Sequence, residues 1–165
     1  MANAKNTADV GVIFVCLGNI CRSPTALGIF RGLVARDNLA EKIFTDSAGT
    51  SGFHLGDPPD PRSIATARER GIDLTAFRSR QAKAADFQRF RYVVAMDRQN
   101  HRDLAKLCPP GAECHLGLLL DYAPGLGQDV PDPYLGADGF DRVYDLIETG
   151  CEGLLAHIRR THFTA

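Results

Sequence analysis

The chain has 165 residues, of which 44% are hydrophobic and 24% are charged, and its formal net charge is -1 at pH 7. A chain of this length and composition can bury the core of one globular domain without help from disulfides or metals. The near-neutral charge gives no electrostatic reason to expect nucleic acid or a membrane as a partner. No apolar stretch approaches the roughly 18 residues of a membrane helix, and residues 1–10 lack the basic start and apolar run of a secretory signal.

The sequence contains five cysteines, an odd number that argues against a disulfide framework. Because nothing indicates export, we expect free thiols in a reducing cytosol and predict a cytoplasmic protein. We also expect residues 1–9 to form a flexible N-terminal segment and residues 10–165 to form the single domain.

Stretches of strand character alternate with stretches of helical periodicity along the chain. Residues 10–16 are almost all apolar and rich in β-branched side chains, which is typical of a strand buried on both faces. Apolar residues then recur at helical spacing from Pro24, with Ser23 as the expected N-cap. A second strand is expected over residues 42–48, ended by Gly49.

The alternation continues to the C-terminus. The remaining expected elements are a helix over 61–70, a strand over 92–96, a helix over 98–107, a strand within 113–118 and an amphipathic helix beyond 140. This order predicts a single doubly wound α/β domain, with a four-stranded parallel sheet flanked by helices. Ligands of such sheets bind beyond the carboxyl ends of the strands, where Cys16 is expected.

The loop after the first strand, residues 16–23, reads Cys-Leu-Gly-Asn-Ile-Cys-Arg-Ser. A strand-loop-helix unit presents backbone N–H groups and the positive end of a helix dipole to an anion. Gly18 and Asn19 tolerate the positive φ angles that such a loop requires. The loop is therefore predicted to bind a phosphate group.

A thiol at the start of this loop can act as a nucleophile, because a helix N-terminus and a nearby guanidinium favour the thiolate form. Arg22 lies six residues after Cys16. If the loop curls around one anion, the Arg22 guanidinium can therefore reach the phosphoryl oxygens and bind two of them. Ser23 can turn its hydroxyl onto the sulfur. Cys16 is predicted to be the nucleophile and Arg22 the phosphate clamp.

These residues closely resemble the low-molecular-weight protein tyrosine phosphatase family, and the resemblance covers essentially the whole chain from Val10. Besides the loop, the matching segments are Ser47-Ala48-Gly49-Thr50-Ser51, Asp60-Pro61-Arg62, Gly71-Ile72, Arg80-Gln81, Ala95-Met96-Asp97 and Asp132-Pro133-Tyr134. The resemblance implies that residues 10–165 hydrolyse phosphotyrosine in protein substrates through a phosphocysteine, without a metal or cofactor. It also makes a bacterial tyrosine kinase of polysaccharide export a candidate substrate, because such kinases are frequent partners of bacterial relatives.

The resemblance assigns the general acid, and later the general base, to Asp132; without it, Asp132 would be one of several loop aspartates. It places the walls of the substrate pocket at Tyr134, Phe53, Leu17 and Ile20, and His54 is the one histidine expected to touch substrate. The residues predicted to bind phosphate or to support the loop are Leu17, Gly18, Asn19, Ile20, Cys21 and Ser23. For Asp97 we expect a helix N-cap, and a brace for the active-site loops is a second role that it could combine with the first.

Three residues depart from the common pattern of the family. Phe53 stands where many relatives carry tryptophan, and Leu135 stands where many carry another aromatic residue. Phe77 replaces a histidine that often supports the loop asparagine, so Asn19 must be held in some other way. By resemblance, Cys21 is predicted to form a reversible disulfide with Cys16 that shields the nucleophile; the alternative is a small packing residue.

Three other functions share parts of this pattern. Thiol-dependent arsenate reductases share this loop but pass the oxidation to further cysteines. In the thioredoxin-coupled type one of these follows the third strand, where this chain has Ala95-Met96-Asp97, and Cys108 and Cys114 lie past the next helix. Relatives that resemble arginine phosphatases carry threonine where this chain has Ile20. A binding module without activity would be expected to have lost Cys16 or Asp132. The spacing of Cys108, Cys114 and His115 fits no usual zinc site.

Overall fold

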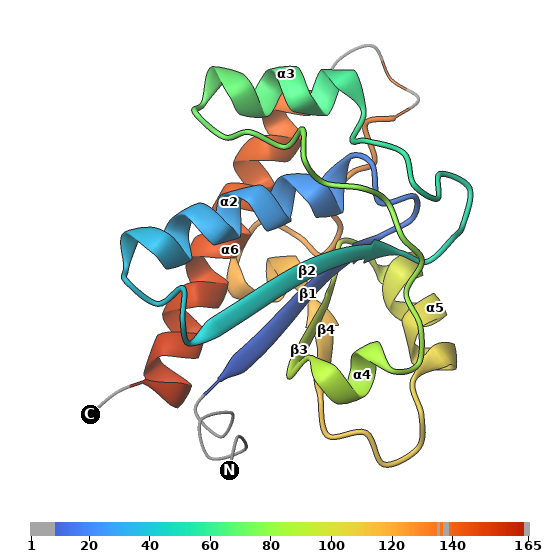
Figure 1. Cartoon of the computed structure of the whole chain (residues 1–165), viewed down its shortest axis with the longest axis vertical. Helices are drawn as coiled ribbons and strands as arrows, with labels where there is room; N and C mark the ends of the chain where they lie inside the picture. Colours follow the sequence, from blue (N-terminus) through green and yellow to red (C-terminus); the bar gives the residue numbers. More distant parts are fainter. Residues whose placement is uncertain (1–8, 135, 137–138, 164–165) are drawn as a thin grey trace.

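The computed structural model describes residues 9–134, 136 and 139–163. Apart from Asp9, the predicted flexible segment 1–9 lies outside the described residues, and so does Leu135. Four strands form one sheet in the order β2-β1-β3-β4 (Figure 1). These are β1 (Val10–Cys16), β2 (Ile43–Gly49), β3 (Tyr92–Ala95) and β4 (His115–Leu118).

All three strand pairs are parallel, so the predicted four-stranded parallel sheet is confirmed. In register, Cys16 at the end of β1 lies beside Gly49 at the end of β2. After β1 the chain adds β2 on one side of it and then crosses back to add β3 on the other side. This change in the direction of the strand order leaves a crevice beyond the carboxyl end of β1, and Cys16 lies there.

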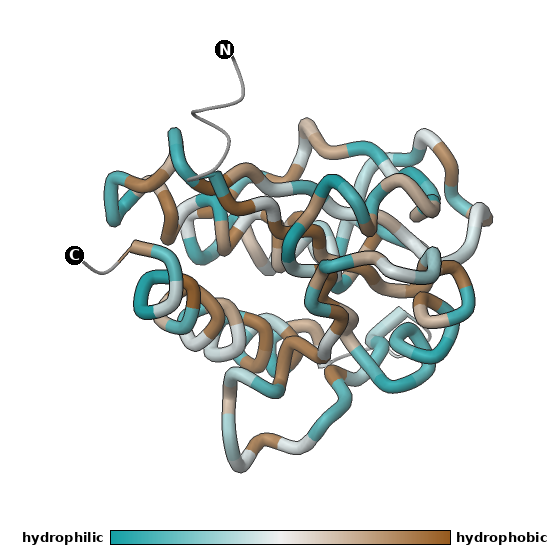
Figure 2. The backbone as a smooth tube through the Cα atoms, turned by 90° about the horizontal axis from the view of Figure 1, so that it is seen from below, coloured by the Kyte–Doolittle hydropathy of each residue, from teal (hydrophilic) through white to brown (hydrophobic). Residues whose placement is uncertain are grey.

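Helices cover both faces of the sheet (Figure 1). On one face lie α2 (Arg22–Arg36), α3 (Pro61–Glu69) and α6 (Phe140–His162), and on the other lie α4 (Asp86–Arg89) and α5 (Arg98–Leu107). Alternate residues of β1 serve the two layers: Phe14 packs with α2 and α6, whereas Ile13 and Val15 pack with α4 and α5. In Figure 2 hydrophobic and hydrophilic residues accordingly alternate around the turns of the helices.

Of the two helix N-caps expected from the sequence, one is wrong and one is confirmed. Helix α2 begins at Arg22 with Cys21 in the N-cap position, so Ser23 is not the N-cap; its hydroxyl lies beside Cys16 instead. The expected cap at Asp97 is confirmed, because its carboxylate accepts a hydrogen bond from the backbone N–H of Asn100 at 2.7 Å. The short helices α4 and η1 (Leu119–Tyr122) have no counterpart among the elements expected from the sequence.

Helix α6 continues through Gly150 and Gly153, although glycine disfavours the interior of a helix. A Cβ atom at Gly153 would collide with the carbonyl oxygen of Tyr122, and one at Gly150 would lie 2.6 Å from the Leu119 side chain. The two glycines therefore allow η1, which follows β4, to lie directly against α6.

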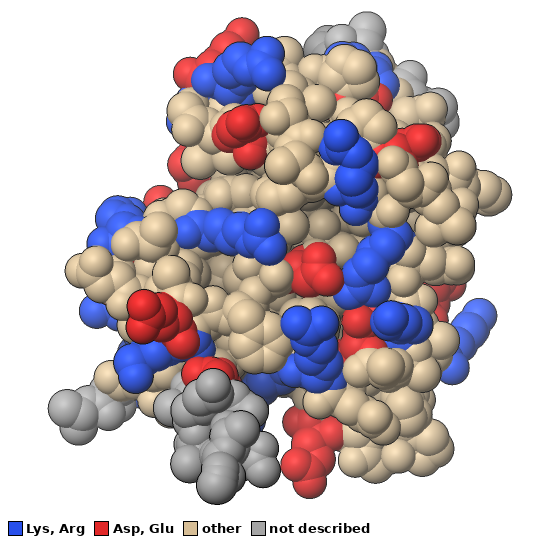
Figure 3. Space-filling view, viewed as in Figure 1, with Lys and Arg blue, Asp and Glu red and all other residues tan. Residues whose placement is uncertain are grey.

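Acidic and basic side chains are interspersed over the face shown in Figure 3, as the small net charge leads one to expect. None of the helices in the described part of the chain combines the length and apolar character needed to span a bilayer. Among the described residues, no group of three or more His, Cys, Asp or Glu side chains could hold a metal ion.

Candidate active site

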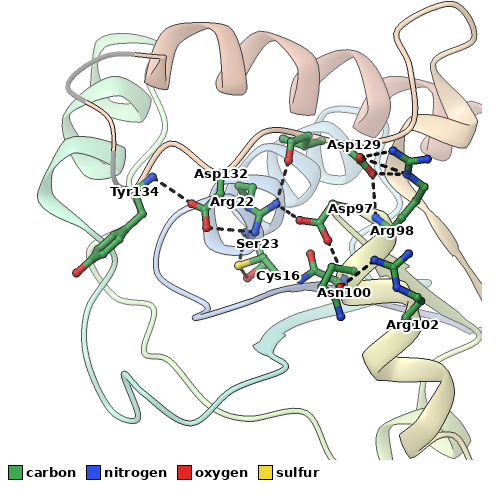
Figure 4. A network of polar contacts seen from close by, with 12 residues as sticks. Cys16, Arg22, Ser23, Asp97, Arg98, Asn100, Arg102, Asp129, Asp132 and Tyr134 are labelled. Carbon is green, nitrogen blue, oxygen red and sulfur yellow. Dashed lines mark hydrogen bonds and ion pairs between the residues drawn. The ribbon is translucent and has the colours of Figure 1, made fainter.

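The loop of residues 16–23, called the phosphate loop below, connects the carboxyl end of β1 to the first turn of α2. Cys16 is 2% exposed, and its sulfur lies 3.1 Å from the hydroxyl oxygen of Ser23 (Figure 4). The backbone N–H of Ser23 also points at this sulfur, at 3.4 Å. The thiol therefore faces donors at the start of a helix, an arrangement that favours negative charge on sulfur.

Asn19 holds the phosphate loop in its curled form. Its backbone adopts the left-handed conformation with φ 58°, and its side chain is 3% exposed. The amide nitrogen donates to the hydroxyl oxygens of Ser23 at 2.7 Å and Ser47 at 3.0 Å, while its oxygen accepts from the backbone N–H of Arg80 at 3.0 Å. These bonds hold Asn19 in place without the histidine that Phe77 replaces. The Phe77 ring packs against the core and lies under the guanidinium of Arg31.

Carbonyl groups of the phosphate loop are bound from outside. The Cys16 carbonyl accepts from Thr50 N–H at 2.8 Å, and the Ile20 carbonyl accepts from Asp60 N–H at 2.8 Å. The Gly18 carbonyl accepts from the buried hydroxyl of Ser79 at 3.0 Å. Because the two ends of a peptide group point in opposite directions, carbonyls turned outward leave the following N–H groups directed into the loop, toward an anion.

Arg22 is 2% exposed and is braced from two sides. Its Nη1 donates to the carboxylate of Asp97 at 2.6 Å and to the carbonyl oxygen of Val130 at 2.9 Å, and its Nη2 lies 3.5 Å from the carboxylate of Asp132. Burial opposes the charged form of Arg22, but the charge of Cys16 and the two carboxylates outweigh it and raise its pKa. Asp97 thus serves both as helix cap and as brace.

Asp132 lies opposite the phosphate loop in a second loop, called the acid loop, of which the structure describes residues 130–134 and 136. One carboxylate oxygen accepts a hydrogen bond from the backbone N–H of Tyr134 at 3.0 Å, and the side chain is 41% exposed. Figure 4 shows the Asp132 carboxylate next to Arg22, with Cys16 and Ser23 below them in the view. A carboxyl group in this position can exchange protons with a group bound in the phosphate loop.

A cavity of about 270 Å³ joins the two loops. Its walls are Cys16, Leu17, Gly18, Ile20, Cys21, Arg22, Phe53, His54, Asp132 and Tyr134. The structure thus brings together the site residues predicted from the sequence, with Asn19 and Ser23 behind the cavity wall. At the rim, Phe53 is 81% exposed, and the rings of His54 and Tyr134 lie 5.9 Å apart, so that apolar and aromatic surface surrounds the entrance.

The two cysteines of the phosphate loop have different surroundings. Burial raises the pKa of the Cys21 thiol to about 12, and the charges of Asp60, Cys16 and Asp132 act in the same direction. Cys21 therefore stays protonated at neutral pH. Both thiols are free, and the disulfide between them stays a prediction.

Several supporting residues were not identified from the sequence. Ser47, Ser79 and Arg80 hold Asn19 and Gly18, and Arg62 contacts the acid loop. Apart from Ser79, they lie in segments that match the family, yet the sequence offers no means to tell a loop support from an ordinary surface residue. Such a role becomes visible only when the segments are placed next to each other.

The fold and the site define an α/β protein with a thiol at the base of an anion-binding loop, and the comparisons with known proteins agree. The sequence profile of the family described as "Low molecular weight phosphotyrosine protein phosphatase" matches residues 11–163. The low molecular weight protein-tyrosine-phosphatase YfkJ of Bacillus subtilis is 43% identical over 92% of this chain and 97% of its own length. The human low molecular weight phosphotyrosine protein phosphatase is 40% identical over 90% of this chain and 95% of its own length.

Solved structures give the same result. The crystal structure of YfkJ from Bacillus subtilis matches with a TM-score of 0.88 over 93% of this chain and 96% of that one. A Drosophila arginine phosphatase matches with a TM-score of 0.84 and 33% identity, over 90% of this chain and 97% of that one. The chain belongs to the low molecular weight phosphotyrosine protein phosphatase family.

Proposed function

We propose that this protein hydrolyses phosphotyrosine in protein substrates through a covalent phosphocysteine at Cys16. One observation carries the proposal: the Cys16 thiol, the Arg22 guanidinium and the Asp132 carboxyl group line one cavity at the start of a helix. Family membership supports it, since the curated relatives compared above are named for phosphatase activity toward tyrosine.

In the first step, the Cys16 thiolate attacks phosphorus and forms an S–P bond while the bond from phosphorus to the phenolic oxygen breaks. Arg22 and the loop N–H groups bind the three non-bridging oxygens, and Asp132 donates a proton to the leaving phenolate. The ionic partners of Arg22 keep it charged throughout. The Ser23 hydroxyl, 3.1 Å from the sulfur, stabilises the thiolate before attack.

In the second step, water attacks phosphorus and the S–P bond breaks. Asp132, now a carboxylate, takes a proton from the attacking water, and inorganic phosphate leaves. Cys16 departs as thiolate and again receives support from Ser23. None of these steps calls for a group beyond the residues named.

Tyrosine is the favoured substrate side chain because the cavity walls rise around the phosphate loop. Phe53, Leu17 and Tyr134 present apolar surface at the rim, which suits the flat ring of phosphotyrosine, whereas phosphoserine is too short to use it. Arginine phosphatase activity is the second candidate, because one structural relative is a Drosophila arginine phosphatase. Ile20 in the loop, where the resembling arginine phosphatases carry threonine, favours tyrosine.

An arsenate reductase is disfavoured by the position of the other cysteines. Cys114 directly precedes β4, and Cys108 ends α5. Because the strands are parallel, Cys114 lies at their amino ends, whereas Cys16 lies at the carboxyl end of β1. A relay of oxidation from Cys16 to this pair is therefore not supported.

We further propose a cytoplasmic location, supported by the five free cysteines. A bacterial tyrosine kinase of polysaccharide export is a candidate substrate on the strength of the family resemblance alone. Substrate trapping with the Asp132→Ala variant, followed by mass spectrometry, identifies the bound phosphoprotein. Recovery of proteins that carry no phosphotyrosine would contradict the proposal.

The test of substrate class uses three peptides of one sequence that carry phosphotyrosine, phosphoserine or phosphoarginine. We expect kcat/KM for the phosphotyrosine peptide to exceed the other two by at least about 100-fold, the discrimination available from burying an aromatic ring. A higher kcat/KM for the phosphoarginine peptide would show that the substrate side chain is phosphoarginine and not phosphotyrosine. Arsenate reduction without phosphatase activity would overturn the proposal.

A further inference from the structure

Arg62 joins the start of α3 to the acid loop. Its Nη1 donates to the carbonyl oxygen of Gly136 at 2.9 Å, and its Nη2 donates to that of Tyr134 at 2.8 Å. The guanidinium carbon also lies 5.7 Å from the centre of the Tyr134 ring and 4.7 Å from that of Phe140. One side chain thus fastens the part of the acid loop that follows Asp132.

Asp60 fixes Arg62 from the other side. Its carboxylate accepts from Arg62 Nε at 3.0 Å and from Nη2 at 2.9 Å, in the two-pronged geometry that sets the plane of the guanidinium. Asp60 is 7% exposed, and the hydrogen bonds from Arg62 lower its pKa. The backbone N–H of Asp60 donates to the carbonyl oxygen of Ile20. Arg62 is thereby tied to the phosphate loop.

Asp132 lies between two anchors of the acid loop. Before it, Val130 donates its N–H to the Met96 carbonyl and accepts from Arg22. After it, Tyr134 donates its N–H to the Asp132 carboxylate and accepts from Arg62 through its carbonyl oxygen. The residue that orients the carboxylate is therefore the residue that Arg62 holds.

We propose that Arg62 is a positioning residue for proton transfer: it sets the distance of the Asp132 carboxyl group from the phosphate loop by holding Tyr134. The inference rests on the proposed role of Asp132 and deepens it. The proposal predicts that the effect of losing Arg62 depends on the leaving group. Loss of Arg62 should slow reactions in which the leaving group needs a proton and should spare those in which it does not.

The experiment compares kcat/KM for phenyl phosphate, a poor leaving group, with that for 2,4-dinitrophenyl phosphate, which departs as an anion. For Arg62→Gln we expect a loss of about 10-fold or more on phenyl phosphate and of no more than about 2-fold on the dinitrophenyl ester. Arg62→Lys keeps the charge but cannot bind Asp60 and two carbonyl groups in one plane, so we expect partial rescue.

Arg70→Gln is the matched control. Arg70 ends the same helix α3, its guanidinium lies 4.3 Å from the centre of the Tyr144 ring, and it pairs with Asp141 and Asp145. Its partners thus lie on α6 rather than on the acid loop. We expect its kinetics on both esters to match the unmodified protein, and a selective loss here would overturn the inference.

A double-mutant cycle separates positioning from general support. In the Asp132→Asn background, Arg62→Gln should cost no further activity on phenyl phosphate, because the group it positions is gone. An equal loss on both esters, or full additivity with Asp132→Asn, would show that Arg62 only stabilises the structure. If the loss of kcat/KM in Asp132→Asn is the same for both esters, Asp132 is not the general acid, and the inference about Arg62 is then wrong as well.

Discussion

The two loops that meet at the cavity are held in different ways. In the phosphate loop, Asn19 and Ser23 are 3% and 0% exposed, and three hydrogen bonds fix the Asn19 side chain. In the acid loop, Asp132 is 41% exposed, and distant side chains, Arg22 and Arg62, hold the residues on either side of it. The anion site is thus built into the fold, whereas the position of the acid depends on long-range contacts.

This difference separates two kinds of kinetic defect. A change in the phosphate loop alters the binding of the phosphoryl group, which all substrates share, so its effect should not depend on the leaving group. A change in the acid loop alters protonation of the leaving oxygen, so its effect should grow as the leaving group becomes poorer.

Cys16→Ser should abolish turnover, with kcat lowered by about 10⁴-fold or more on every ester, because removing the nucleophile removes the reaction path. The variant should still bind vanadate or phosphate, since Arg22 and the backbone of the loop remain. Cys151→Ser, at a buried cysteine that packs in the core and does not line the cavity, is the control for loss of a thiol. Residual turnover near that of the unmodified protein would reject Cys16 as the nucleophile.

Asp132→Asn should lower kcat/KM for phenyl phosphate by about 10²–10⁴-fold and spare the dinitrophenyl ester. The neighbouring Asp129→Asn serves as control, because Asp129 pairs with the exposed Arg98 at 3.0 Å and does not line the cavity. A uniform loss over all leaving groups in Asp132→Asn would place this residue with the phosphate loop and remove the contrast between the two loops.

Asn19→Ala should lower kcat/KM by about 10–100-fold, as expected when buried hydrogen-bond partners are left unsatisfied. Phenyl and dinitrophenyl esters should be affected alike. Asn38→Ala gives a matched control, because Asn38 also has a positive φ, 60°, but lies in the exposed turn after α2. A strong dependence on the leaving group in Asn19→Ala would contradict the division between the loops.

Ser79→Ala should cost less, about 2–10-fold in kcat/KM on both esters, because a single neutral hydrogen bond to the Gly18 carbonyl is lost. Ser51 makes a similar bond to the Leu17 carbonyl at 3.0 Å from a more exposed position. Water can replace that hydroxyl, so Ser51→Ala should have the smaller effect. The reverse order would show that burial does not decide which outer contacts stabilise the phosphate loop.

The smallest effect concerns stability against acid. Arg62 lowers the pKa of Asp60 in the folded protein, so the pair contributes stability above the unfolded pKa of about 4, and this is lost as pH falls through the folded value. Arg62→Gln should therefore lower Tm at neutral pH, and the difference from the unmodified protein should shrink below about pH 4. A difference in Tm that grows on acidification would contradict the ion pair.

The phosphate loop could be predicted from the sequence because its parts are contiguous. Strand, loop and helix follow one another between Val10 and Arg36, so the positions of Cys16 and Arg22 follow from local rules. The error at Ser23 has a tertiary cause: its hydroxyl is bound to Cys16 and Asn19 and is unavailable as a cap. Likewise, Gly153 disfavours a helix by itself, yet η1 requires its small size.

The acid loop could not be derived in this way. Nothing local distinguishes Asp132 from Asp129, and its role came from the resemblance to the family. The supports at Ser47 and Arg62 come from segments distant in the sequence, and hydrophobic periodicity carries no information about such polar contacts. Phe77 illustrates the same limit: the sequence shows that a histidine common in relatives is missing, but only the structure shows that the backbone N–H of Arg80 and the hydroxyls of Ser23 and Ser47 hold Asn19.

The most direct test of the central claim is to locate the phosphoryl group on the enzyme. When Asp132→Asn is mixed with 2,4-dinitrophenyl phosphate, the first step needs no acid but the second lacks its base, so phosphoenzyme should accumulate. Acid quenching and peptide mapping by mass spectrometry should then find one phosphoryl group on Cys16. Phosphate on Cys21, or continued turnover with no phosphorylated cysteine, would contradict the account.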